Sequence, residues 1–231
     1  MMMAEIRTVS ETGSTNDDLA ALARDGAAEG VWLRAERQTG GKGRQGRAWA
    51  SPPGNFYAST LVRLQSGDPP APTLALVAAV ALHEAAAIYA PSVQIKWPND
   101  LLFDGAKLAG VLLTRQGDAV IIGFGVNLAH HPTDLGRPAT SLAALAGMAP
   151  GPGPFLEILA EAFARWLGRW RGEGLAPVRA RWLAAAHPLG TPLATADAEG
   201  LFDGLDESGA LRLRLAGGGL RVIHAGDVFL I

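Results

Sequence analysis

Short apolar or alternating runs recur along the chain, which is the pattern of β-strands. They cover residues 5–9 (EIRTV), 30–36 (GVWLRAE), 55–64 (NFYASTLVRL) and 92–98 (SVQIKWP). Residues 107–128 predict a β-hairpin with QGD at its turn. Several of these runs are bounded by glycine or proline, which favour turns. A sheet is therefore predicted from these segments.

Helical spacing replaces this pattern in four other segments, of which the first is residues 13–26 (GSTNDDLAALARDG). Leu19 begins an apolar stripe along it, and its final glycine is a stop signal. Ser14 suits an N-cap, and Asp17, three residues later, completes a variant of the capping box. We therefore expect a helix that Ser14 caps.

The other helical segments are residues 71–90, about 154–171 and 175–186. The first is rich in alanine and leucine and nearly long enough to cross a bilayer. His83 and Glu84 lie in its middle, however, and no Lys or Arg closely flanks it. We predict a buried helix of a soluble protein.

The pattern changes near residue 187. Residues 187–231 form short apolar runs separated by glycine turns, with no helix signal, which is typical of a small β-barrel. We therefore expect two domains, residues 1–186 and 187–231.

Composition limits the class of protein. The 231 residues are 48% hydrophobic and 18% charged, which predicts a packed core, and the net charge of -2 disfavours a general nucleic-acid binder. The absence of cysteine excludes disulfides, thiolate metal sites and a cysteine nucleophile. It fits a reducing cytoplasm, and the N-terminus shows no secretory signal.

One segment, residues 40–49 (GGKGRQGRAW), combines four glycines with Lys42, Arg44 and Arg47. Glycine lets backbone N–H groups approach a ligand, and fixed cations attract an anion such as a phosphate. The segment is not a Walker A loop. A solvated hairpin loop with ordinary surface cations is the alternative, but Trp49 favours a loop that anchors itself or covers a ligand.

A second motif, residues 96–100 (KWPND), follows a predicted strand. Pro98 forces a turn, so Asn99 and Asp100 would project at the strand's carboxyl edge, where they could hold a hydroxyl and a metal-bound phosphate. An ordinary Asx-turn is the alternative. The pair His130–His131 has no third ligand at a recognisable spacing, so a polar loop is expected there rather than a metal site.

Together these motifs, in this order and spacing, resemble those of biotin protein ligases. The resemblance rests on GGKGRQGRAWASPPGNFY, KWPNDLL and KLAGVLL, with support from GSTNDDLA, Gln38, GFGVNL and GLAPVRARWL, and it covers essentially the whole chain. It implies an α+β fold. A class II synthetase-like catalytic domain with a mixed central sheet flanked by helices would occupy residues 1–186, and an SH3-like β-barrel residues 187–231.

The resemblance also implies a reaction. Biotin and ATP would form biotinyl-5′-AMP, and the biotin would pass to a lysine of the biotin carboxyl carrier domain of acetyl-CoA carboxylase or a related carboxylase. The cytoplasm is the expected location. Because the biotin carboxylate and the ATP phosphates are both anionic, fixed cations would offset the repulsion between them. Mg²⁺ would be held mainly by the ATP phosphates, with Asp100 as its candidate protein neighbour.

Site residues follow from the resemblance, residue by residue. The biotin-binding set is Ser14, Thr15, Asn16, Gln38, Gly41, Lys42, Gly43, Arg44, Lys107 and Gly110, above an apolar floor near residues 111–113 and 121–126. The ATP-binding set is Arg44, Arg47, Trp49, Lys96, Asn99, Asp100, Lys107 and Asn127. The catalytic set is Lys107, Arg44 and Asp100, with Asp100 as the hypothetical acceptor of the carrier lysine's proton.

Two positions depart from the family pattern. Lys42 and Gln45 stand where arginine is usual, and lysine keeps the charge of arginine but not its fork. Nothing in the sequence corresponds to the N-terminal helix-turn-helix of bifunctional members, so we expect a ligase that does not bind DNA. Some relatives dimerise through the central sheet, and an exposed edge strand could serve a homodimer here.

Two alternatives stay open at the level of sequence. A lipoate or octanoate ligase would share the fold, although it lacks a reason to carry KWPND, and a transferase that works through a cysteine thioester is excluded. A non-catalytic phosphate-binding module is the other alternative, and adenylate formation would separate it from an enzyme.

Overall fold

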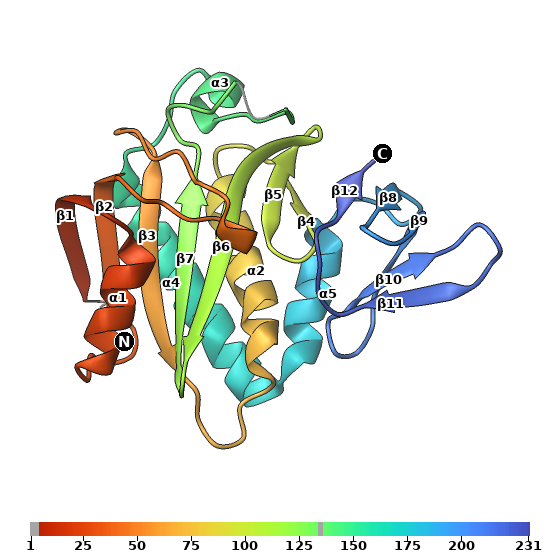
Figure 1. The fold of residues 1–231 in the computed structure, drawn as a ribbon, viewed down its shortest axis with the longest axis horizontal. Helices are drawn as coiled ribbons and strands as arrows, with labels where there is room; N and C mark the ends of the chain where they lie inside the picture. Colours follow the sequence, from red (N-terminus) through yellow and green to blue (C-terminus); the bar gives the residue numbers. More distant parts are fainter. Residues whose placement is uncertain (1–4, 134–135) are drawn as a thin grey trace.

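The computed structural model describes residues 5–133 and 136–231, and its larger sheet has seven strands in the order β1-β2-β3-β7-β6-β5-β4 (Figure 1). Only β1 and β2 are parallel, and every other neighbouring pair is antiparallel, so the sheet is mixed. The strands are β1 Ile6–Thr12, β2 Trp32–Gln38, β3 Phe56–Arg63, β4 Gln94–Lys96, β5 Asp100–Phe103, β6 Ala106–Gln116 and β7 Ala119–Val126.

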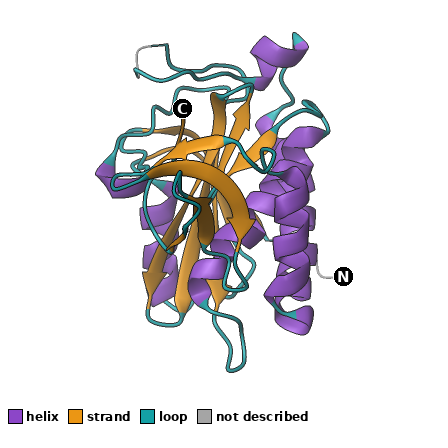
Figure 2. Ribbon diagram, turned by 90° about the vertical axis from the view of Figure 1, so that its right-hand side faces the viewer, coloured by secondary structure: helices purple, strands orange, loops and turns teal. Residues whose placement is uncertain are grey.

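Helices cover both faces of this sheet, and Figure 2 shows the long ones stacked along one side. The helices are α1 Thr15–Arg24, α2 Leu74–Ala87, α3 Leu142–Ala146, α4 Pro152–Glu173 and α5 Leu175–Ala185, with short 3-10 turns η1 Arg44–Gly46 and η2 Ala71–Thr73. The predicted helices near 154–171 and 175–186 are confirmed within a few residues. Within the described residues, no helix has the length and apolarity needed to span a membrane.

The alternation of side chains along a strand explains how the two faces of one sheet form two separate cores. Along β7, Ile122 and Phe124 belong to the large core under α2 and α4, whereas Ile121 belongs to a smaller core under α1. Successive side chains of a strand point to opposite faces, so Gly123 and Gly125 follow Ile121 on the α1 face. These two positions of β7 therefore carry no side chain on that face, close to the N-terminal end of α1.

A smaller antiparallel sheet follows α5, with the strand order β11-β10-β9-β8-β12. Its strands are β8 Pro192–Ala194, β9 Glu199–Leu205, β10 Leu211–Arg214, β11 Leu220–Ile223 and β12 Phe229–Leu230. The fold is thus α+β, with a mixed sheet flanked by helices and a small SH3-like β-domain, as predicted. The boundary at residues 186 and 187 lies between α5 and β8, and it stays a prediction.

Several local predictions were wrong. Ser14 occupies the N-cap of α1, but its side chain makes no capping hydrogen bond, and Asp17 pairs with Lys42 instead of closing a capping box. The strand expected over 92–98 is shortened to β4, and Asp100 begins the unpredicted strand β5. Helix α3 was also not predicted, and the polar loop expected before it, residues 130–141, includes residues 134 and 135, which lie outside the described residues.

The junction of the two sheets buries a titratable residue. His187 is 4% exposed, its ring lies 4.5 Å from that of Phe202, and neither ring nitrogen has a hydrogen-bond partner among the described residues. Burial is the largest influence: it outweighs the opposing effect of the Pro188 backbone and, with a smaller contribution from the Lys96 charge, lowers the pKa of His187 from 6.5 to about 4. The folded protein therefore keeps this imidazole neutral where the unfolded chain protonates it.

This difference predicts a pH dependence of stability. Because the folded pKa lies below the unfolded one, the contribution is fully present above pH 6.5 and is lost as the pH falls toward 4. When the pH is lowered from 7.5 to 5, the unfolding free energy of both proteins should fall. The fall should be about 2 kcal/mol smaller in His187→Leu than in the wild type. Urea unfolding at both pH values measures this, with exposed His224→Gln as the control. Equal losses in wild type and His187→Leu would contradict the assignment.

Candidate active site

A pocket opens on the α1 face of the large sheet, where β7 is bare. Most predicted site residues line it: Ser14, Thr15, Asn16, Gln38, Lys42, Gly43, Arg44, Arg47, Trp49, Lys96, Asp100, Lys107 and Gly110. They come from α1, the loop after β2, and strands β4 to β6. The chain thus brings together motifs that are nearly a hundred residues apart in sequence.

Three predicted residues lie outside this lining: Gly41, Asn99 and Asn127. Asn99 donates from Nδ2 to the Val111 carbonyl at 2.7 Å, and Asn127 donates from Nδ2 to the Thr140 carbonyl at 3.0 Å. A Cβ on Gly41 would lie 2.6 Å from the Trp49 carbonyl, so only glycine fits there. In this geometry the three residues support the backbone around the pocket, and their ligand contacts stay a prediction.

One end of the pocket is a chain of neutral polar groups, all of them buried except the half-buried Gln38. Gln38 Oε1 accepts from the Thr15 backbone N–H at 2.9 Å, and Thr15 Oγ1 lies 2.7 Å from Ser59 Oγ. Ser59 Oγ in turn donates to Asn16 Oδ1. A Cβ on Gly123 would clash with the Asn16 amide, so the bare strand makes room for this network. Fixed donors and acceptors of this kind suit a neutral group that carries both N–H and C=O.

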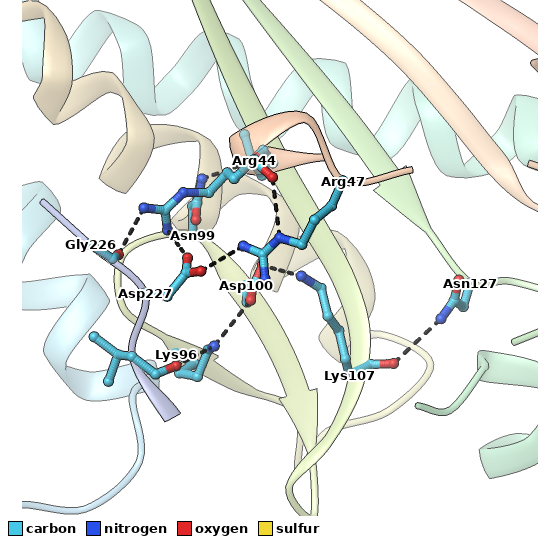
Figure 3. Close-up of polar contacts among 11 residues, drawn as sticks. Arg44, Arg47, Lys96, Asn99, Asp100, Lys107, Asn127, Gly226 and Asp227 are labelled. Atoms are coloured by element: carbon cyan, nitrogen blue, oxygen red, sulfur yellow. Dashed lines mark hydrogen bonds and ion pairs between the residues drawn. The ribbon is translucent and has the colours of Figure 1, made fainter. Parts of the chain in front are cut away.

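The middle of the pocket holds a largely but not fully buried cluster of one carboxylate and two ammonium groups, whose side chains are 13–16% exposed. Lys107 Nζ donates to Asp100 Oδ1 at 2.6 Å, and Lys96 Nζ lies 3.2 Å from Asp100 Oδ2 (Figure 3). Burial alone would raise the pKa of Asp100, but the two lysines outweigh it and hold the pKa below its ordinary value. Burial lowers the pKa of Lys107, against the opposing effect of Asp100.

The loop of residues 40–49, rich in glycine and cations, forms the cover of the pocket. Trp49 packs on β7, where a Cβ on Gly125 would lie 2.6 Å from its ring, and Lys107 Nζ is 5.6 Å from the ring centroid. The Trp49 indole N–H is buried and has no acceptor among the described residues. Trp49 therefore anchors the loop, as one reading of the sequence predicted, and its free N–H can serve a ligand.

Two cations of this loop contact the C-terminal β-domain, which the sequence did not predict. Arg47 Nη2 donates to Asp227 Oδ2 at 2.7 Å, and Arg44 Nη2 donates to the Gly226 carbonyl at 2.8 Å (Figure 3). Arg137 also lines the pocket and was missed. Neither Asp227 nor Arg137 stands in a recognisable motif, so their position in the fold was the only signal.

The lining as a whole is strongly positive. It contains six cationic side chains against the two carboxylates of Asp100 and Asp227. Both oxygens of Asp100 are already engaged by lysines. Among the described residues, no cluster of three or more Asp, Glu and His side chains could hold a metal ion. The pocket can therefore receive a carboxylate and a polyphosphate, whose negative charges would offset its own.

Comparison with known proteins agrees with this geometry. Residues 14–127 match the Biotin/lipoate A/B protein ligase family, and residues 193–231 match the Biotin protein ligase C terminal domain. The fold and the pocket thus define a chain of the biotin and lipoate ligase class.

Individual relatives narrow the class. The biotin–[acetyl-CoA-carboxylase] ligase of Paracoccus denitrificans is 42% identical, over 96% of this chain and 98% of its own. The corresponding Mycobacterium tuberculosis ligase is 35% identical, over 97% of this chain and 88% of its own. A biotin protein ligase from Aquifex aeolicus in complex with biotin and ATP superposes with a TM-score of 0.89, at 25% identity, covering 98% and 99% of the two chains. The chain belongs to the biotin protein ligase family.

The charge cluster predicts an asymmetry between two substitutions. Asp100→Asn leaves two lysines with no carboxylate partner in the cluster and should lower the unfolding free energy by about 2–3 kcal/mol. Lys107→Met leaves Asp100 paired with Lys96 and should lower it by less than about 1 kcal/mol. Urea unfolding of both variants and of the double variant measures the coupling. Equal costs for the two single changes would contradict this view of the cluster.

Proposed function

We propose that this protein activates biotin with ATP and transfers it to a lysine of a biotin carboxyl carrier domain. The observation that carries the proposal is the layout of one pocket. A neutral polar end built on Thr15, Asn16 and Gln38 leads to the Lys107 cluster and then to the loop arginines. Biotin has the matching order, with a ureido ring at one end and a carboxylate at the other.

In the first step the biotin carboxylate attacks the α-phosphorus of ATP. A new P–O bond forms, the bond to the leaving oxygen breaks, and pyrophosphate departs with the electron pair. The carboxylate needs no base. Lys107 offsets the charge where the two anions meet, and Arg44 and Arg47 offset the charge of the phosphates. The covering loop keeps water from the mixed anhydride.

In the second step the carrier lysine attacks the carbonyl carbon of biotinyl-5′-AMP. An amide bond forms, and AMP leaves with the electrons of the C–O bond. The amine must lose a proton, and Asp100 is the proposed acceptor. Two lysines lower the pKa of Asp100, which makes it a weak base while both remain paired with it. This role therefore requires that substrate binding first draws the lysines away.

Other parts of the proposal rest on the family and on charge. Mg²⁺ would enter with the ATP phosphates, which carry most of its ligands. Asp100 is the proposed protein neighbour of this ion, and it would first have to release a lysine. The carrier domain of acetyl-CoA carboxylase is the proposed partner, and the cytoplasm the proposed location. We propose no role for DNA, because the net charge is -2 and the basic loop turns into the pocket.

We also propose a homodimer, because the large sheet has an exposed edge strand. Strand β1 is an edge strand of the seven-stranded sheet, and most of its residues are exposed. Its free N–H and C=O groups could pair with a second copy. The division into a catalytic domain of residues 1–186 and a β-domain of residues 187–231 is likewise our proposal.

Isotope exchange tests the function directly. Purified protein with ATP, Mg²⁺ and labelled pyrophosphate should form labelled ATP when biotin is added, but not with lipoate or octanoate. Lys107→Ala should reduce this exchange by at least about 100-fold, because it removes the charge nearest the reacting oxygens. Arg115→Ala, an exposed cation on the same strand β6, is the matched control. Exchange with lipoate alone would show that the substrate is lipoate rather than biotin. No exchange with any acid would indicate a non-catalytic binding module.

The departure at Lys42 predicts how firmly the adenylate is held. Lys42 Nζ lies 2.5 Å from Asp17 Oδ2 at the surface. An ammonium group cannot donate two parallel hydrogen bonds to a phosphate, as a guanidinium group does. Lys42→Arg should slow the dissociation of biotinyl-5′-AMP by about 3- to 10-fold. A chase of labelled adenylate with excess biotin and no ATP measures the rate. An unchanged rate would show that bidentate hydrogen bonding to the phosphate plays no part at this position.

A further inference from the structure

The segment before β12 brings a carboxylate into the pocket that the proposed reaction does not use. Asp227 lies between the guanidinium groups of Arg44 and Arg47 (Figure 3). Its Oδ2 accepts from Arg47 Nη2 at 2.7 Å, and its Oδ1 lies 3.8 Å from Arg44 Nη1. The Asp227 side chain is 21% exposed, so it is part of the pocket wall rather than a free surface acid.

The backbone on either side of Asp227 makes contacts of the same kind. The Gly226 carbonyl accepts from Arg44 Nη2 at 2.8 Å, and the Val228 carbonyl accepts from Lys96 Nζ at 2.8 Å. Three consecutive residues therefore engage three cations from two distant parts of the chain. An arginine has five N–H donors and a lysine three, so these contacts orient the cations and leave donors free for a ligand.

Without a counter-charge, the two arginines would not stay together. Their positive charges repel, and each long side chain loses rotamer entropy when it is fixed. The Arg44 carbonyl accepts from the Arg47 backbone N–H and from Arg47 Nε, each at 3.2 Å, but neither contact fixes the two guanidinium groups relative to each other. A carboxylate between the guanidinium groups offsets the repulsion and completes the ordering before any ligand binds. Affinity rises when such ordering is complete in advance.

We propose that Asp227 is a positioning residue for the nucleotide. It holds Arg44 and Arg47 over the pocket, so that the triphosphate of ATP meets two guanidinium groups already in place. The identity of this ligand rests on the proposed function, whereas the contact itself is present without it. The small β-domain thereby takes part in nucleotide binding through side chains of the larger domain.

Kinetics in the isotope exchange assay test the proposal. Asp227→Asn keeps the size of the side chain and removes its charge. It should raise the KM for ATP by about 3- to 10-fold, the size expected for a partly exposed pair with an arginine, and change the KM for biotin by less than about twofold. Asp227→Glu keeps the carboxylate and should restore most of the ATP KM. A purely structural role would move both KM values or the protein's stability instead.

Asp203→Asn is the matched control. Asp203 lies in the same small sheet, and its Oδ2 is 2.7 Å from Arg212 Nη2 in a pair of similar exposure. Neither residue lines the pocket. This variant removes the same charge from the same domain, and its ATP KM should equal that of the wild type.

A second measurement needs no ligand and no activity. Trypsin cleaves after lysine and arginine, and a protease acts fastest on a segment that opens locally, so the rate of cleavage after Lys42, Arg44 and Arg47 reports how often the loop opens. Asp227→Asn should speed this cleavage by about 3- to 10-fold in the ligand-free protein, and Asp203→Asn should not. An unchanged cleavage rate or ATP KM overturns the proposal, and a lowered ATP KM overturns it by showing that Asp227 competes with phosphate. If the wild type shows no biotin-dependent exchange, the proposed function fails, and the digestion still decides the role of Asp227.

Discussion

The site depends on a steric constraint within one strand, β7. On the face toward α2 and α4 the strand must fill a core, and Ile122 and Phe124 do so. On the opposite face it must stay empty, and Gly123 and Gly125 leave that space to Asn16 and Trp49. Because side chains alternate along a strand, a register slip by one residue would put Phe124 into the pocket and open a void in the core. Packing and function therefore fix the same register.

Charge balance is the second constraint, because the pocket concentrates cations before any substrate is present. The structure offsets five of the six locally: Asp100 lies between two lysines, Asp17 faces Lys42, and Asp227 faces the loop arginines. An anionic substrate can exchange with such partners or add to them. Preorganised charge of this kind costs stability in the empty protein and lowers the barrier when negative charge develops.

The chemistry could be predicted from the sequence further than the local structure could. The strands, the long helices and most of the pocket lining followed from periodicity and from the resemblance of the motifs. The capping box failed because Asp17 found a stronger partner in Lys42, 25 residues away, which no local rule anticipates. Strand β5 was missed because its four residues directly follow a turn motif. Asp227 was missed because its role depends on two residues about 180 positions earlier.

The two ends of the pocket are built in different ways, and this difference bears on selectivity. The neutral end comes from buried side chains that already bond one another, such as Thr15, Ser59 and Asn16. A ligand that fails to match them leaves buried polar groups unpaired, which strongly disfavours analogues. The charged end comes from ion pairs between distant segments, which tolerate rearrangement. Discrimination between acids should therefore reside at the neutral end, while the charged end binds any activated carboxylate and governs how long it is retained.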